Sequence, residues 1–315
     1  MLVSIVKLLI QMFFVILFSP LITGLIRKLK AKVQHRIGSP ILQPYYDIWK
    51  LLKKDMVASS TASWIYFVAP YIYFTTSLAA CLCLPVISQL TGFTAYTDIL
   101  FIVYLLVAGR VFIALASLDT GSTFGGMGSS REMLISALIE PAFFITLITV
   151  SIKSGSGSTN VSSIYSYMQN IDIGLSSVSP VSILLFLCML LVLITETSRI
   201  PVDDPATHLE LTMVHEAMTL EYSGRHLAFI QIGSYLKQFM LMTFIANILM
   251  PFGMDVGNVF VALTIFVLKI LLITVVIAVI ELSTVKFRLF SMPNIAAIAF
   301  ILGILGFMSG FIFNI

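Results

Sequence analysis

The chain has 315 residues and is strongly apolar. Hydrophobic residues make up 59% of it, charged residues only 10%, and the mean hydropathy is +1.04. An average soluble domain carries about 25% charged residues, so this composition excludes a soluble globular core. The net charge of +3 is small and gives no support for nucleic-acid binding.

Eight apolar runs follow one another along the chain. A bilayer core needs about 20 apolar residues per spanning helix, and most of the runs reach that length. We therefore expect an all-α, polytopic membrane protein surrounded by lipid, with residues 1–315 forming one membrane domain. Lys7 is the only basic residue near the start of the first run, and no signal-peptide cleavage site follows it. The run is therefore interpreted as a membrane helix rather than a signal peptide. The runs are Leu2–Ile26, Trp64–Leu90, Asp98–Leu118, Met133–Lys153, Pro180–Glu196, Ala228–Met250, Val256–Leu282 and Pro293–Phe313.

Basic residues between the runs predict the topology. Cytoplasmic loops collect Lys and Arg, and thirteen of the eighteen basic residues lie in the connections after runs one, three, five and seven. We therefore expect these connections to face the cytoplasm and both termini to face outward, in the inner or plasma membrane. The thirteen are Arg27, Lys28, Lys30, Lys32, Arg36, Lys50, Lys53, Lys54, Arg131, Arg199, Arg225, Lys286 and Arg288.

Two of these inner segments, 27–63 and 197–227, are long and charged, so we expect the protein's chemistry there. In the first, Pro44 begins a helical pattern in which Ile48 and Trp49 share an apolar face opposite basic residues. This pattern predicts an amphipathic helix in the membrane interface. The alternative is a basic loop that serves only orientation.

The second segment is rich in carboxylates. Six of the fifteen acidic residues fall within 26 residues, among apolar side chains that favour burial. Burial and mutual repulsion raise the pKa of carboxyl groups, which then exchange protons near neutral pH. A solvated loop is the alternative interpretation. The six are Glu196, Asp203, Asp204, Glu210, Glu216 and Glu221.

A helix is expected from Asp204 toward Tyr222, because Asp204 and Pro205 suit the N-cap and the first helical position. Glu210 and Glu221 are eleven residues apart, which is close to three helical turns. On such a helix they would share one face.

Ionisable residues inside the spans are rare and mark either ion paths or pairing partners. Glu140 is the strongest candidate, as an ion-path residue or as the partner of Arg110 or Arg131 in a structural ion pair. Arg110, Lys269 and Glu281 are further candidates of this kind.

Ligands for metals and cofactors are sparse. His208 and His215 are seven residues apart, which suits structural hydrogen bonding or a proton relay but supplies too few ligands for a metal. Cys81, Cys83 and Cys188 lie in apolar runs without a CxxC pair. No phosphate-binding loop or hydrolase motif occurs. We expect no iron–sulfur cluster, haem or zinc in this chain, and neither an ATP-driven pump nor a hydrolase.

Three sequence blocks and the eight-run plan resemble the family that contains subunit 1 of respiratory complex I and the equivalent membrane subunit of energy-converting hydrogenases. The blocks are ETSRIPVDDPATHLELTMVHEAMTLEYSG at Glu196–Gly224, RIGSPILQPYYDIWKLLKKD at Arg36–Asp55, and LDTGSTFGGMGSSRE at Leu118–Glu132. The residues of these motifs resemble those of the hydrogenase branch more closely, which includes formate hydrogenlyase subunit 4 and the membrane-bound hydrogenase M-type subunit.

Two departures from the complex I pattern disfavour a quinone site of complex I design. Ala206 and His208 stand where that pattern has glutamates, and three residues are inserted between Glu210 and Glu221.

The resemblance implies an eight-helix bundle that couples electron transfer in partner subunits to ion translocation and has no catalytic activity of its own. Electron transfer in hydrogenase-like large and small subunits, which would carry the nickel–iron centre and iron–sulfur clusters, would act on segment 197–227. The carboxylates would pass the response to antiporter-like membrane subunits, as H⁺ or Na⁺ translocation. Arg199 is expected to pair with Glu196 and Asp203. The ion-coupling candidates are Glu140, Glu196, Asp203, Glu210, Glu216, Glu221 and Arg199, and the relay or structural candidates are Asp119, Arg131, Glu132, His208, His215, Glu281, Lys269 and Arg110.

Two other functions remain open. One is the quinone-binding membrane subunit of an NADH:quinone oxidoreductase, the counterpart of subunit 1 of complex I. The other is a stand-alone ion transporter, a class that often shows inverted repeats, and no such repeat relates the two halves of this chain.

Overall fold

The computed structural model describes residues 2–59, 61–86, 97–153, 159–161, 163–164, 180–203, 213–250, 259–287 and 291–312. Within these ranges the chain is almost entirely helical and contains no strand, which confirms the expected all-α class.

Seven helices of the described chain are long and apolar enough to cross a membrane. A shorter apolar helix, α7 (Pro180–Glu196), begins where the described chain resumes. Together these eight helices correspond to the eight predicted runs. The seven are α1 (Leu2–Val33), α3 (Trp64–Cys83), α4 (Ile99–Asp119), α5 (Thr123–Lys153), α9 (Gly224–Phe244) with the π-helical turn η3 (Ile245–Leu249), α10 (Val259–Ser283) and α11 (Met292–Ile312).

Two predicted helix ends are wrong. The second run was expected to continue to Leu90, but α3 ends at Cys83 because Leu84, which precedes Pro85, is held in the extended conformation. The fourth helix begins ten residues before Met133, through a Gly- and Ser-rich stretch of low helix propensity. Close tertiary packing overrides that propensity.

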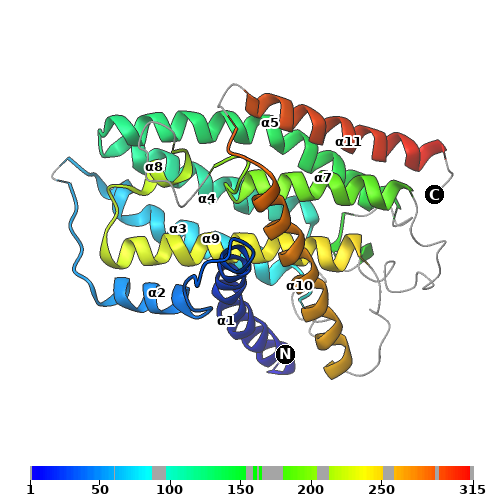
Figure 1. Cartoon of the computed structure of the whole chain (residues 1–315), viewed down its shortest axis with the longest axis horizontal. Helices are drawn as coiled ribbons and strands as arrows, with labels where there is room; N and C mark the ends of the chain where they lie inside the picture. Colours follow the sequence, from blue (N-terminus) through cyan, green and yellow to red (C-terminus); the bar gives the residue numbers. More distant parts are fainter. Residues whose placement is uncertain are drawn as a thin grey trace.

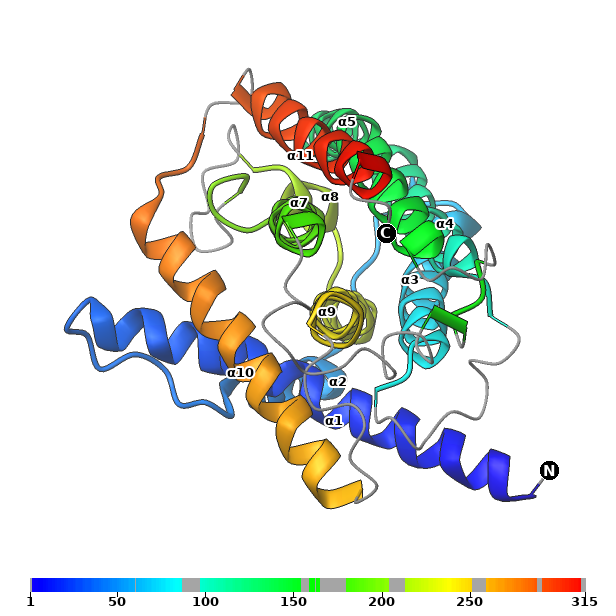
Figure 2. The same cartoon turned by 90° about the vertical axis from the view of Figure 1, so that its right-hand side faces the viewer.

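Helix α9 lies at the centre of the bundle. Figure 2 shows it end-on, with α1, α3, α7 and α10 around it. Of its apolar window, 89% of residues are buried, whereas for α1 the share is 28%. Because α9 is enclosed by protein, polar groups on it face other helices rather than lipid. Helices α1 and α10 diverge from the bundle and expose apolar side chains (Figure 1).

The helix predicted to begin at Pro44 is confirmed as α2 (Gln43–Lys53). It begins with Pro44 in its first turn, as expected, and packs against α9 and α1. Trp49 is 62% exposed, and the Lys53 ammonium lies 4.8 Å from its ring centroid in a cation–π contact. An exposed aromatic ring beside Lys is typical of a helix at the membrane surface.

The helix expected from Asp204 to Tyr222 is not continuous. Asp204 and Glu210 lie outside the described residues, and the helix α8 covers only His215–Thr219. In a longer helix the Val214 N–H would donate to the carbonyl four residues earlier, but it donates instead to Asp203 Oδ2 at 2.9 Å. The structure therefore does not support a shared helical face for Glu210 and Glu221.

Helix α8 rests directly on α5. A Cβ atom on Gly128 of α5 would lie 2.8 Å from Ala217 Cβ and 2.9 Å from the Val214 carbonyl oxygen. Only glycine permits this approach. The contact places α8 against α5.

Candidate functional site

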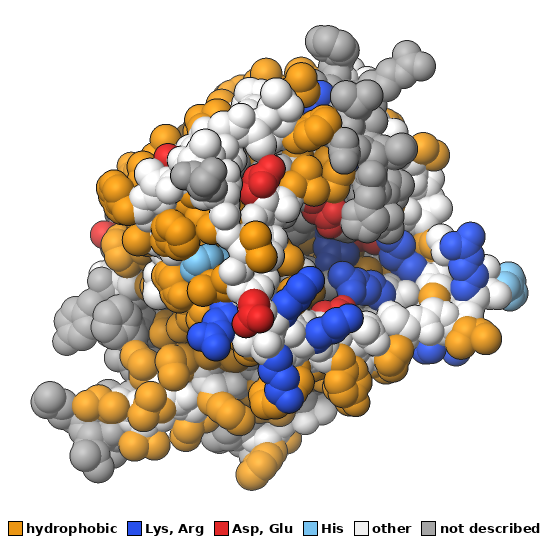
Figure 3. Space-filling view, turned by 90° about the vertical axis from the view of Figure 1, so that its left-hand side faces the viewer, with side chains coloured by type: hydrophobic (Ala, Val, Ile, Leu, Met, Phe, Trp, Pro, Cys, Tyr) orange, Lys and Arg blue, Asp and Glu red, His pale blue; other side chains and the backbone are white. Residues whose placement is uncertain are grey.

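A cavity of about 610 Å³ lies at the end of the bundle where α2 and α8 are found. Figure 3 shows that Lys and Arg side chains gather on this face, with Asp and Glu among them. The cavity is lined by α1, α7, α8 and α9 and by Asp203 after α7. We call this end the basic end.

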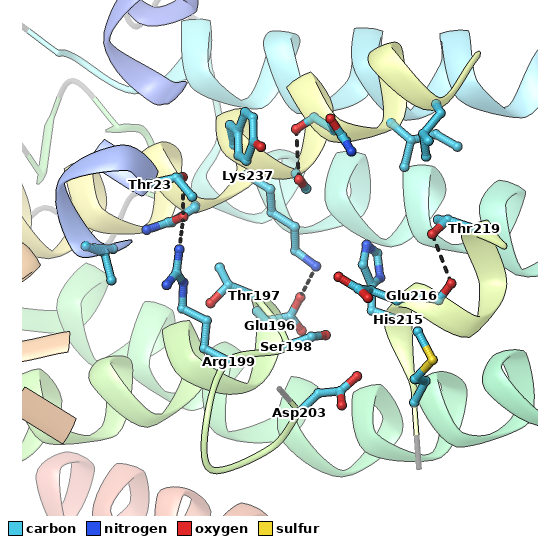
Figure 4. A pocket seen from close by; sticks show the side chains of 18 of the residues that line it. Thr23, Glu196, Thr197, Ser198, Arg199, Asp203, His215, Glu216, Thr219 and Lys237 are labelled. Atoms are coloured by element: carbon cyan, nitrogen blue, oxygen red, sulfur yellow. Dashed lines mark hydrogen bonds and ion pairs between the residues drawn. The ribbon is translucent and has the colours of Figure 1, made fainter. Parts of the chain in front are cut away.

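Glu196 is one of the charged residues that line the cavity. It is the last residue of α7, where Ser198 takes a left-handed conformation (φ 48°) and turns the chain. Its carboxylate accepts from Lys237 Nζ of α9 at 2.7 Å and is also paired with the Arg110 guanidinium of α4. Figure 4 shows Lys237 reaching from α9 to Glu196, with His215 and Glu216 beyond it. Glu196 thus has two buried cationic partners.

Arg110 connects this cluster to α5. Its second terminal nitrogen, Nη1, donates to Glu140 Oε1 of α5 at 2.7 Å. Glu140 therefore belongs to an ion pair with Arg110, one of the two interpretations left open by the sequence. We call Glu140, Arg110, Glu196 and Lys237 the inner charge chain. It holds two carboxylates and two cations on four different helices, so its formal charge is balanced.

The expected pairing of Arg199 with Glu196 and Asp203 is wrong. Arg199 Nη1 contacts Glu281 Oε1 of α10 at 2.7 Å, and its Nη2 donates to Gln238 of α9 at 2.7 Å. Lys30 of α1 holds the other oxygen of Glu281, also at 2.7 Å. The turn after α7 directs Arg199 toward α10, so it joins three helices at the cavity wall.

Asp203 connects the turn after α7 to the residue that precedes α8. It is 2% exposed, and its Oδ1 accepts from Lys286 Nζ at 2.6 Å, while Oδ2 accepts from the Val214 N–H. Lys286 follows α10. The carboxylate therefore links the end of α10 to the beginning of α8.

Glu132 is a buried carboxylate on α5, 5% exposed. Its charged contact is with His215 Nδ1 of α8 at 4.0 Å, which counts as an ion pair only when His215 is protonated. Burial lowers the pKa of His215. The negative charges of Glu132 and Asp203 raise this pKa, whereas the positive charges of Lys237 and Arg110 lower it further. Arg131, next to Glu132, donates to the Met213 carbonyl at 3.2 Å and helps to hold α8.

Other candidates lie away from the inner charge chain. Asp119 accepts from the N–H of Ser63, the N-cap residue of α3, at 2.7 Å. Lys269 donates to the Met250 carbonyl at 2.6 Å, beyond the far end of α9. Glu216 lines the cavity, whereas Glu221 is exposed and is not among the lining residues. His208 and Glu210 fall outside the described residues.

The sequence interpretation missed three residues that the structure places in the site. Lys237 lies in the sixth apolar run, and the rule that selected Lys269 would have selected it too. Lys30 was counted only toward topology. Tyr73 of α3 lines the cavity, and no sequence signal separated it from the other ten tyrosines.

The site is suited to holding and moving charge. Buried carboxylates held by Lys and Arg change their proton affinity when a partner moves. Among the described residues, no cluster of three or more His, Cys, Asp or Glu side chains could hold a metal ion.

Known proteins resemble this chain over nearly its whole length. The NADH dehydrogenase family model matches residues 6–309. Hydrogenase-4 component C of Escherichia coli (strain K12) is 29% identical over 302 residues, covering 95% of this chain and 93% of that protein. Formate hydrogenlyase subunit 4 of the same organism is 30% identical over 305 residues, covering 96% and 97%.

More distant similarity extends to complex I and to a solved structure. NADH-ubiquinone oxidoreductase chain 1 of Triticum aestivum is 28% identical over 222 residues, covering 68% of this chain and 65% of that protein. A chain of the membrane-bound sulfane sulfur reductase, an archaeal respiratory membrane complex, superimposes with a TM-score of 0.84 at 20% identity, covering 97% and 99%. At this identity the superposition shows a shared fold.

Proposed function

Because the chain belongs to the NADH dehydrogenase family, we propose that it is the membrane coupling subunit of an energy-converting, hydrogenase-type oxidoreductase related to complex I. The similarity to hydrogenase-4 component C and formate hydrogenlyase subunit 4 supports this branch. The chain is a multi-pass membrane protein, and we propose that its basic end faces the cytoplasm, as the distribution of Lys and Arg predicts.

The observation that carries the proposal is the inner charge chain. Its four residues come from α5, α4, α7 and α9 and lead from the partly exposed Glu140, through the buried Arg110, to Glu196 and Lys237 at the cavity of the basic end. Ionisable residues inside a membrane are costly and generally mark ion paths. A charge change at the cavity would alter Lys237 and Glu196 first and, through Arg110, reach Glu140.

The partners in this proposal carry the redox chemistry. Hydrogenase-like large and small subunits, with a nickel–iron centre and iron–sulfur clusters, would bind at the basic end beside α2 and α8. Antiporter-like membrane subunits would receive the response and move H⁺ or Na⁺. Glu210, Glu216 and Glu221 remain part of this proposal as candidate contacts for the soluble partners.

The test is ion translocation by the Glu140→Gln complex in sealed membrane vesicles. Glutamine keeps the size of the side chain and a hydrogen-bond acceptor for Arg110 but carries no charge. We expect normal assembly and a fall in ion translocation of about tenfold or more, the effect of losing one charged hydrogen-bond partner. Electron transfer is measured in the same vesicles.

The matched control is Asp98→Asn, the same kind of change at an exposed carboxylate beside the first turn of α4, at the opposite end from the cavity. It should translocate ions like the parent. Parental translocation by Glu140→Gln as well would contradict the proposal.

The cavity favours a second candidate, a quinone-binding site. Its volume falls in the range of small-molecule sites. Its lining is rich in paired charges, whereas a quinone ring with an isoprenoid tail requires an apolar channel, so we rank this function second. Quinone-dependent electron transfer by the purified complex, lost in a variant that narrows the cavity such as Ser234→Phe, would favour it over the first.

A further inference from the structure

The ring of Tyr73 is held in a slot between two glycines. A Cβ atom on Gly233 of α9 would lie 2.6 Å from Tyr73 Cδ1, and one on Gly109 of α4 would lie 3.3 Å from Cδ2. Tyr73 is 4% exposed. Any larger residue at Gly233 would displace the ring, so three helices together fix the direction of this side chain.

The Tyr73 side chain reaches the site. Tyr73 lines the cavity together with Glu196, Lys237 and His215. Its ring lies against Gly109, the residue before Arg110 in α4, and its hydroxyl is within electrostatic range of Arg110, of Glu196 on α7 and of Glu132 on α5. None of the described residues forms a hydrogen bond with this hydroxyl. A phenol has one donor and acceptor capacity, so the hydroxyl is equipped to bridge a carboxylate and a cation.

Two of its charged neighbours also have unused hydrogen-bonding capacity. The Nη atoms of Arg110 bind Glu140 and Glu196, but its buried Nε–H has no acceptor among the described residues. Glu132 is buried, and its 4.0 Å contact with His215 is too long for a hydrogen bond. Buried polar groups in folded proteins almost always find partners.

We propose that Tyr73 is a positioning residue of the inner charge chain, and that its hydroxyl and one bound water join Glu132 to Arg110. The Arg110 Nε–H, the Tyr73 hydroxyl and the Glu132 carboxylate supply three polar partners, the usual number for a buried water. Glu132, which faces α8, is thereby connected to Glu196 and Glu140. The connection between Glu132 and Arg110 is inferred from the geometry, whereas its role in ion translocation rests on the proposed function.

Tyr73→Phe tests the inference, because it keeps the ring in its glycine slot and removes only the hydroxyl. The matched control is Tyr104→Phe, whose side chain is 62% exposed on α4. The purified complex of each variant is imaged by high-resolution electron cryo-microscopy, and its ion translocation is measured against pH in sealed vesicles. We expect Tyr73→Phe to lose the water density beside Arg110 Nε and to move the Glu132 side chain.

In the vesicles, Tyr73→Phe should reduce ion translocation about tenfold and displace its pH profile, while Tyr104→Phe matches the parent in both measurements. If Tyr73→Phe fails to assemble, 3-fluorotyrosine at position 73 keeps the shape and changes only the acidity of the hydroxyl. If the pH profile of ion translocation were the same with 3-fluorotyrosine as with tyrosine, the inference would be overturned.

The two proposals fail in different ways. Unchanged density around Glu132 and Arg110 in Tyr73→Phe, together with a parental pH profile, would overturn the role of Tyr73, even if Glu140→Gln abolished translocation. Displaced side chains with full translocation in both Tyr73→Phe and Glu140→Gln would support the link and contradict the proposed coupling function.

Discussion

Single residues decide whether the buried charges are tolerated. The side chains of Glu196 and Lys237 are 4% and 6% exposed, so neither is stabilised by bulk water. Removing one member of a buried pair leaves an uncompensated charge and strongly destabilises a protein. Arg110 still pairs with Glu196 when Lys237 is removed. The loss of stability is therefore smaller than for a carboxylate left without any cation.

Lys237→Met should therefore lower the free energy of unfolding by about 1.5–3 kcal/mol, because the Glu196 carboxylate loses one charged hydrogen-bond donor and keeps its pair with Arg110. The measurement is denaturant unfolding in micelles, followed by tryptophan fluorescence. Lys50→Met on the exposed surface of α2 is the control and should change stability by less than about 0.5 kcal/mol. Equal effects of the two substitutions would show that Lys237 does not stabilise Glu196.

At the scale of single elements, the position of α8 depends on polar contacts at its start and on close packing against α5. Helix α8 has five residues and is held by Asp203 at its start, by Arg131 from α5, and by the close approach at Gly128. So short a helix is unstable alone. Its docking is therefore sensitive to the charge of His215, which faces Glu132, Asp203, Lys237 and Arg110.

Acidification should loosen α8. Burial lowers the pKa of His215 from about 6.5 in the docked state, so docking is favoured while the histidine is neutral. This contribution is present above the undocked pKa and is lost as pH falls through the lower, docked pKa. We expect hydrogen exchange of the amides of 213–219, corrected for intrinsic rates, to become faster below about pH 6.5.

His215→Gln should remove that pH dependence, while His35→Gln, at an exposed histidine after α1, should retain it. If His215→Gln and the parent showed the same acceleration, another group would have to control the docking of α8.

At the scale of the whole molecule, the proposed function makes the bundle a charge-carrying scaffold and assigns the redox chemistry to partner subunits. The three cysteines are buried in apolar surroundings, and Cys81 and Cys188 donate to the carbonyls of Leu236 and Ala299 at 3.2 and 3.1 Å. Thiols arranged in this way are packed side chains and do not form a ligand set for a cluster.

The purified chain should accordingly show no visible absorbance from haem, flavin or an iron–sulfur cluster. The same spectrum recorded on the intact complex, where the proposed partners contribute their clusters, is the positive control. A chromophore bound in stoichiometric amount to the isolated chain would contradict this expectation.

The sequence by itself determined the class of protein and the order of its helices. Membrane helices must satisfy their backbone hydrogen bonds internally, so apolar length alone located eight helices and Pro44 located α2. Charges inside the spans marked Glu140 and Arg110 by the same reasoning. These inferences need only local information.

Tertiary structure decided which charges meet. Arg199 is three residues from Glu196 in sequence, yet the turn after α7 directs it to Glu281, while Glu196 pairs with Lys237 and Arg110 from distant helices. The helix expected from Asp204 to Tyr222 is interrupted at Val214, because the Val214 N–H donates to Asp203 rather than to a carbonyl of a helix. Pairing in a helical bundle depends on how each helix is rotated and on which small residues allow close approach, and neither is encoded in the spacing of charges along the chain.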